Sequence, residues 1–177
     1  MPDLRNYLAL LERVDQLCHG TQTRLASRIS CRPGCDACCR HLSVFAVEAA
    51  ALKEALNALP AAEADLIRQR ARQAGPEAPC PLLHDGLCQL YRARPIICRT
   101  HGLPLLISRD GESGVDFCPE NFRGLESIPG SEVIDLDRLN ALLTAVNALF
   151  LRSSPGPERL TVARALAGRD REDKEIA

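Results

Sequence analysis

The chain of 177 residues carries 22 basic and 23 acidic side chains, for a formal net charge of −1, and has four phenylalanines, two tyrosines and no tryptophan. This balance gives no positive field for nucleic acid, and so few aromatic residues leave little surface on which bases could stack. The length fits one domain with its own hydrophobic core. We therefore expect a single domain that binds no nucleic acid.

The N-terminal segment predicts a cytoplasmic protein that does not contact a membrane. Asp3, Arg5 and Glu12 interrupt any apolar region of the kind found in a secretory signal, and no stretch approaches the ~18 apolar residues of a transmembrane helix. Thiols stay reduced in the cytosol, so a dense cysteine pattern there favours metal binding over disulfide bonds.

A helical segment is expected over residues 1–29. Asp3 is a candidate N-cap, and the residues that follow at steps of three and four form one apolar face: Leu4, Leu8, Leu11, Val14 and Cys18. Cys18 stands alone on this face. We therefore interpret it as a small buried hydrophobic residue and not as a metal ligand.

The cysteine core is expected over residues 30–130. It begins with Cys31-x-x-x-Cys35-x-x-Cys38-Cys39, a spacing that can direct several sulfurs at one centre. Two helices should follow this first block. One is capped by Ser43 and ended by Pro60, and the other runs over residues 61–73.

The segment 79–130 is irregular and contains the second block of cysteines: Cys80, Cys88, Cys98 and Cys118. Loops this long usually need something that orders them, and metal ligation can supply it. We expect one regular element here, a β-hairpin of residues 105–109 and 115–118 around Asp110-Gly111.

Helices return over residues 131–168. Asp135 is a candidate N-cap for the clearest amphipathic helix in the chain, and a short helix with Leu160, Ala163 and Leu166 should follow. The charged residues 169–177 are expected to be a disordered tail. The whole pattern predicts a mainly α fold, a small single-domain helical fold around an irregular, cysteine-rich metal-binding core.

The two blocks resemble the YkgJ-type cysteine-cluster proteins, a family described as a zinc- or iron-chelating domain. The resemblance covers residues 30–119 and implies metal ligands at eight positions: Cys31, Cys35, Cys38, Cys39, Cys80, Cys88, Cys98 and Cys118. Tyr91 and Arg94-Pro95 match the tyrosine and arginine–proline positions of the family. The first gap of the first block is one residue longer than in most members. Flagellin lysine methylases are similar in this domain and hold an iron–sulfur cluster there, but they are longer proteins.

The chemistry of the cysteines leaves the metal and the number of centres open. Eight thiolates would satisfy two four-coordinate sites, or one cluster with four thiols left over. An all-thiolate centre carries negative charge, so nearby cations should offset it, and Arg94 and Arg99 are the candidates for binding a cofactor, with Tyr91 beside them. His41 and His101 lie near the blocks but fit a partner or surface role better than ligation.

Iron–sulfur, with a 4Fe-4S cluster preferred, is the cofactor that the pattern favours, and zinc is the alternative. No histidine takes part in the cysteine spacing as it would in a mixed zinc finger. Cys80-Pro81 and Cys118-Pro119 also resemble the Cys-Pro of bacterial cluster motifs. The spacing of Cys31, Cys35 and Cys38 is also that of radical S-adenosylmethionine enzymes, but those enzymes use a larger α/β barrel, and Cys39 could close the open iron position.

Three functions remain open from the sequence. The chain could hold an iron–sulfur centre for electron transfer or redox or metal sensing. It could be a zinc-stabilised module that binds another protein, or a cluster-dependent, protein-modifying enzyme that acts with a larger partner. The usual hydrolytic motifs are absent from the sequence, so an enzyme would need the cluster itself as its active group.

Overall fold

The computed structural model describes residues 2–109 and 111–168. The α-helices among these residues are α1 (Arg5–Arg24), α2 (Ala46–Asn57), α3 (Ala61–Gln73), α4 (Ile96–Thr100), α5 (Leu136–Ser153) and α6 (Val162–Leu166). The 3₁₀ turns are η1 (Ala26–Arg28), η2 (Tyr91–Ala93) and η3 (Gly130–Glu132). The strands are β1 (Ser43–Phe45), β2 (Leu83–His84), β3 (Leu87–Cys88), β4 (Leu105–Arg109), β5 (Glu112–Asp116), β6 (Ile134–Asp135) and β7 (Arg159–Thr161).

The strands form three small sheets within the described residues. β1 pairs with β7, β2 pairs with β3, and β4 lies between antiparallel β5 and parallel β6. The predicted hairpin is present as β4 and β5, although its second strand begins at Glu112, three residues before the predicted start. The prediction of a mainly α fold with a hairpin is therefore confirmed.

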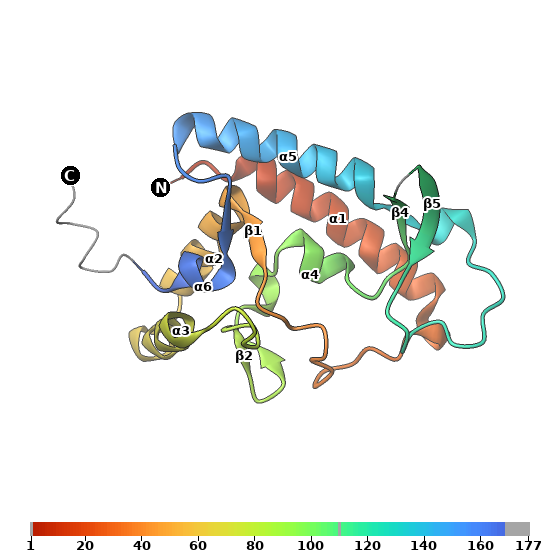
Figure 1. Cartoon of the computed structure of the whole chain (residues 1–177), viewed down its shortest axis with the longest axis horizontal. Coiled ribbons are helices and arrows are strands. Elements are labelled where there is room, and N and C mark those ends of the chain that lie inside the picture. Colours follow the sequence, from red (N-terminus) through yellow and green to blue (C-terminus); the bar gives the residue numbers. More distant parts are fainter. Residues whose placement is uncertain (1, 110, 169–177) are drawn as a thin grey trace.

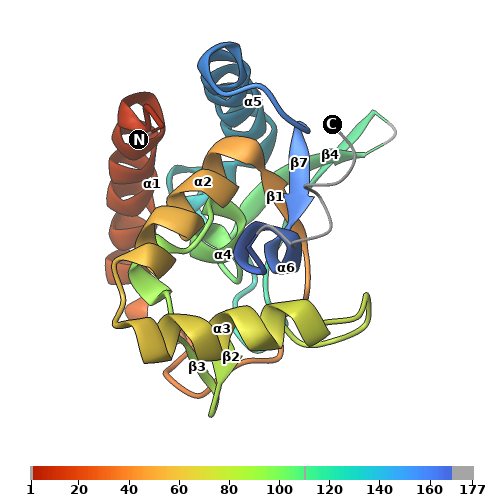
Figure 2. The same ribbon diagram turned by 90° about the vertical axis from the view of Figure 1, so that its left-hand side faces the viewer.

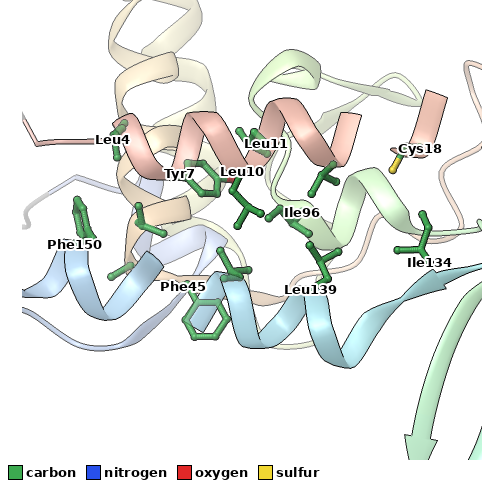
Figure 3. Packing of buried hydrophobic residues seen from close by; sticks show 14 of the residues in the cluster. Leu4, Tyr7, Leu10, Leu11, Cys18, Phe45, Ile96, Ile134, Leu139 and Phe150 are labelled. Atoms are coloured by element: carbon green, nitrogen blue, oxygen red, sulfur yellow. The ribbon is translucent and has the colours of Figure 1, made fainter. Parts of the chain in front are cut away.

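Two long helices form one side of the molecule. α1 and α5 lie side by side and run in opposite directions (Figure 1). Their apolar faces meet the start of α2 and the short helix α4 in one hydrophobic cluster, which contains Tyr7, Leu11, Ile96 and Leu139 (Figure 3). Cys18 is 5% exposed in this cluster, as its place on the apolar face predicted. Asp135 accepts a hydrogen bond from the Arg138 amide at 2.9 Å and caps α5.

A second hydrophobic cluster lies between α2, α3 and α6. Leu52, Leu56, Ile67 and Leu166 are almost fully buried there. Figure 2 shows α3 crossing beneath α2, with α6 beside them and the β2–β3 hairpin below α3. The residues next to the hairpin strands belong to this same cluster, so the second core supports part of the cysteine region.

The structure corrects two predicted helix caps. Ser43 does not cap a helix, because it lies in β1 and pairs with Thr161 of β7. α2 begins at Ala46 instead, and the side chain of Glu48 in its first turn accepts a hydrogen bond from the Phe45 amide at 3.0 Å. Asp3 likewise does not occupy the N-cap position of α1, which is Leu4.

Two further predictions were wrong. Leu160 lies in β7 and not in the short C-terminal helix, which is α6 and begins at Val162. The segment expected to contain one hairpin as its single regular element also contains the β2–β3 hairpin and the helix α4.

The helix α4 carries Cys98. Its position is fixed by Glu48, which is 3% exposed and accepts a hydrogen bond from the Ile96 amide at 2.9 Å. The predicted tail, residues 169–177, lies outside the described residues. Among those described, the helices are all too short or too polar to cross a bilayer.

Candidate metal centre

The first cysteine block lies in the loop that leads from η1 to β1 (Figure 1, orange). Two successive turns shape this loop: the Cys35 amide donates to the Arg32 carbonyl at 3.0 Å, and the Cys39 amide donates to the Asp36 carbonyl at 2.8 Å. Cys31, Cys35 and Cys38 are exposed, whereas Cys39 is half-buried. The extra residue in the first gap is therefore accommodated by a turn at Pro33-Gly34.

The second block comes from three different elements. Cys80 precedes β2, and Cys88 ends β3, where it pairs with Leu83 across the hairpin. Cys98 lies in α4, and Cys118 follows β5. All four are half-buried. The side chains of Cys80 and Cys88 also pack against the second hydrophobic cluster.

The two blocks meet at Cys39. The Cys80 amide donates a hydrogen bond to the Cys39 carbonyl at 3.1 Å, and the neighbouring residues Arg40 and Pro79 form an isolated antiparallel bridge. The turn of the β2–β3 hairpin also contacts the first block: a Cβ atom on Gly86 would lie 3.4 Å from the Gly34 Cα atom. Residues 39 to 52 positions apart thus pack backbone to backbone.

The thiols around Cys39 are close enough to raise the pKa values of one another. Burial, and then the neighbouring Cys80 and Cys88 thiols, raises the pKa of Cys98 to about 12. Burial and the Cys80 thiol also raise the pKa of Cys39. Such proximity of like charges is the electrostatic environment that a bound cation relieves, because a metal ion stabilises the thiolate form.

A second point of contact joins Cys31 to Cys118. The buried Asn121 side chain, 2% exposed, accepts hydrogen bonds through Oδ1 from the Ser30 amide at 2.9 Å and the Cys31 amide at 3.2 Å. Its Nδ2 donates to the Gly102 carbonyl at 2.8 Å, and its own amide donates to the Cys118 carbonyl at 2.9 Å. Asn121 thereby holds three chain segments together.

The backbone after Asn121 strengthens this contact. Phe122 has a positive φ of 58°, which is uncommon for an aromatic residue, and its amide donates to the Arg28 carbonyl at 2.7 Å. Its ring packs edge-to-face on Phe117, with the centroids 5.3 Å apart. The two aromatic residues on either side of Cys118 are thus anchored to the end of η1.

Backbone amides favour the thiolate form of the hairpin cysteines. Burial raises the pKa of Cys80, but hydrogen bonds from the Leu82 and Leu83 amides act in the opposite direction. The Leu90 amide has the same effect on Cys88, whose pKa burial also raises. Amides that donate to sulfur offset the negative charge of metal-bound thiolates, so this part of the chain suits metal ligation.

Arg94 lies beside the second block with the extended backbone that a following proline favours, at φ −53° and ψ 136°. Its Nε donates to the Tyr91 carbonyl at 3.1 Å, and Nη1 donates to the Cys98 carbonyl at 3.3 Å. Its guanidinium carbon lies 3.7 Å from the centroid of the exposed Tyr91 ring. The charge of Arg94 lowers the pKa of Cys98 and of Cys88 against the larger effect of burial.

Arg99 is placed differently. Its side chain, 8% exposed, forms an ion pair with Asp15 of α1 at 2.6 Å and donates to the Arg92 and Arg94 carbonyls. It therefore ties the loop before α4 to α1. His41 is also engaged elsewhere, because its Nδ1 lies 3.0 Å from the Gly75 carbonyl and its Nε2 accepts from the Ala163 amide at 3.4 Å.

All nine cysteines are free thiols. Across residues 2–109 and 111–168, no three His, Cys, Asp or Glu side chains are gathered tightly enough to hold a metal ion. The donor set nevertheless fits a thiolate-bound metal, since eight thiols lie on segments that touch one another. Ligation would require them to close in, and the exposed first block is the part with space to move.

Sequence reasoning missed two residues that shape this region, Asn121 and Glu48. Neither belongs to a motif, and each acts by accepting hydrogen bonds from backbone amides of segments distant in sequence. For Asn121, the only signal in the sequence was its nearness to Cys118. For Glu48, the signal was its place in the first turn of a helix, because an acidic residue three positions after an N-cap is a known helix-start pattern.

The comparisons with known proteins agree with the cysteine pattern. The family model CxxCxxCC, described as "Putative zinc- or iron-chelating domain", matches residues 30–118, which is half of the chain. Searches of curated proteins and of solved structures returned no significant match. The matched range begins one residue before Cys31 and ends at Cys118, so it contains the eight cysteines of both blocks. The chain therefore belongs to the CxxCxxCC, or YkgJ-type, family of zinc- or iron-chelating domains.

Proposed function

We propose that this protein holds an iron–sulfur cluster on its cysteine core and uses it for electron transfer or redox sensing. The observation that carries the proposal is the meeting of the two cysteine blocks at the Cys39–Cys80 hydrogen bond and at Asn121. These contacts bring eight thiols from four segments into one region. Iron–sulfur clusters are held by cysteine thiolates and accept ligands that are widely separated in sequence.

The donor set favours iron over zinc. His41, the histidine nearest the first block, has both ring nitrogens within hydrogen-bond distance of backbone atoms of other segments, so the candidate ligands are all sulfur. Zinc accepts four thiolates as well, but its structural sites usually draw their ligands from short, paired knuckles. Here Cys88 and Cys98 come from different elements, and a multi-iron cluster bridges such ligands more easily.

Exposure of the first block supports an electron-transfer or sensing role. Cys31, Cys35 and Cys38 lie at the surface, so a cluster bound by them would be accessible to a protein partner or an oxidant. A bound cluster would supply one-electron chemistry, and a reducing cytoplasm would keep the thiols available. The described residues form no α/β barrel, so the radical S-adenosylmethionine spacing lacks its usual structural context.

Anaerobic purification of the full chain tests the proposal. We expect a brown protein with broad absorption near ~400 nm that bleaches when dithionite is added. The matched control is Cys18→Ala, because Cys18 is buried in the first hydrophobic cluster, and this variant should retain the colour. A colourless protein that contains stoichiometric zinc would contradict the iron–sulfur assignment and favour a zinc-stabilised interaction module.

A further inference from the structure

The eight cysteines of the core fall into two groups of four. We propose that the chain builds two separate thiolate centres, an inner one and an outer one, and this inference rests on the proposed function that these cysteines bind metal. The inner group consists of Cys39, Cys80, Cys88 and Cys98. The outer group consists of Cys31, Cys35, Cys38 and Cys118.

The inner group is built on the second hydrophobic cluster. The Cys80 amide is bonded to the Cys39 carbonyl, and the β2–β3 hairpin holds Cys88 opposite Leu83, whose amide donates to the Cys80 carbonyl at 2.9 Å. The buried residues Leu82 and Leu90 anchor the hairpin to that cluster. The thiols of Cys39, Cys80 and Cys88 all lie close enough to Cys98 to raise its pKa. These four residues are half-buried.

The outer group is built on Asn121. Its side chain holds the Cys31 amide, and its own amide holds the Cys118 carbonyl, so the two cysteines are fixed relative to one another. The Cys31 thiol lies near those of Cys35, Cys38 and Cys118, and each of these raises its pKa in addition to the larger effect of burial.

Cys38 and Cys39 lie at the junction of the two groups. Their thiols are neighbours, and each affects the pKa of the other. Beyond this contact, Cys38 is near Cys35, whereas Cys39 is near Cys80 and Cys88. The turn that bonds the Cys39 amide to the Asp36 carbonyl therefore divides the adjacent cysteines between the groups. This division explains why two cysteines stand side by side, since neighbours on one tetrahedral ion are geometrically difficult.

The two centres should differ in how easily they lose metal. Three of the four outer cysteines are exposed, whereas the inner four are all half-buried and two pack against the second hydrophobic cluster. A chelator should therefore reach the outer centre first. The inner centre should need local opening of the hairpin before its metal is released.

Metal content and chelator kinetics of the purified holoprotein test the inference. The variants are Cys35→Ser in the outer group, Cys88→Ser in the inner group and Cys18→Ser as the control outside both. We expect wild type and control to release metal to excess EDTA in two phases of about equal amplitude. Cys35→Ser should retain about half of the metal and lose only the fast phase. Far-UV circular dichroism verifies that Cys35→Ser is folded, so the test does not depend on the stability of Cys88→Ser.

Three results would overturn the two-centre inference. Single-phase release from the wild type or complete loss of metal from folded Cys35→Ser indicates one centre, and full retention of metal by that variant indicates that Cys35 holds no centre. In these cases the wild type still contains metal, so the proposed metal-binding function stands. Wild-type protein that contains no metal after anaerobic purification overturns both proposals together.

Discussion

The Asn121 side chain accepts a hydrogen bond from the Cys31 amide at 3.2 Å, although 90 residues separate the two positions. This contact connects the start of the first cysteine block to the loop that carries the last cysteine. It is also the reason that the first block, which has few buried side chains of its own, has a defined position. The cysteine region is therefore held by buried hydrogen bonds as well as by hydrophobic packing.

Replacing Asn121 with alanine should destabilise the protein and weaken metal binding by Cys31 and Cys118. The change removes the acceptor of the partly buried Ser30 and Cys31 amide bonds and leaves the buried Gly102 carbonyl without its donor, and a buried group left unsatisfied costs about 1–3 kcal/mol. Urea unfolding and metal analysis measure both effects. The matched control is Asn140→Ala on the exposed face of α5. Equal metal content and stability in the two variants would show that Asn121 is not needed to hold the cysteine region.

Glu48 should make stability depend on pH. Burial raises the pKa of Glu48, more than its hydrogen bonds with the Ile96 and Phe45 amides lower it. The folded state thus binds this proton more tightly, so the contribution to stability is full below the unfolded pKa of about 4.3 and is lost as the pH rises through the folded value. The free energy of unfolding of the wild type, relative to Glu48→Gln, should fall as the pH rises above about 4 and then level off.

The comparison of Glu48→Gln with the wild type is best made at equal metal loading at each pH, by urea unfolding. Glu63→Gln on the exposed face of α3 is the control, and its difference from wild type should stay nearly constant. If the free energy of unfolding of the wild type, relative to Glu48→Gln, rises with pH, the folded state favours the ionised carboxylate of Glu48 and the prediction is wrong.

The long helices could be predicted from sequence because their information is local. The apolar spacing that ends in Cys18 placed α1, and Asp135 marked the start of α5. The pairing of Ser43 with Thr161 was missed because three-residue strands have no periodicity to read and join positions far apart. α4 was missed because five residues after a proline are too few for a helical pattern. For the candidate site, the cysteine positions were visible in the sequence, but the contacts of Cys39 with Cys80 and of Cys31 with Asn121 required the three-dimensional structure.

Arg94→Lys should reduce metal retention or shift the reduction potential of the centre. Lysine keeps the positive charge, but it loses the planar fork that bonds the Tyr91 and Cys98 carbonyls and stacks on the Tyr91 ring. Arg94→Ala should have a larger effect. Metal analysis and a redox titration distinguish these variants from the control Arg138→Ala at an exposed site of α5. If all four proteins behave alike, Arg94 serves only the local turn.

Removal of metal should unfold the region 79–130 before the helical cores. This segment consists of short elements, among them β2, β3 and α4, and carries four of the candidate ligands, whereas α1 and α5 are long helices that share an extensive core. Hydrogen exchange with and without a strong chelator measures this, with the amides of α5 as the internal control. Uniform protection of both regions after complete metal loss would mean that the segment is stable without metal.

The central claim is that the cysteines of both blocks bind an iron–sulfur cluster. Iron and acid-labile sulfide, quantified in the same anaerobically purified sample, test it most directly. The account predicts iron and sulfide in about equal amounts, because the clusters contain both in equal number. It also predicts that Cys98→Ser, which changes the inner-group cysteine carried by α4, lowers both together. Zinc without sulfide, or a chain free of metal, would contradict the claim.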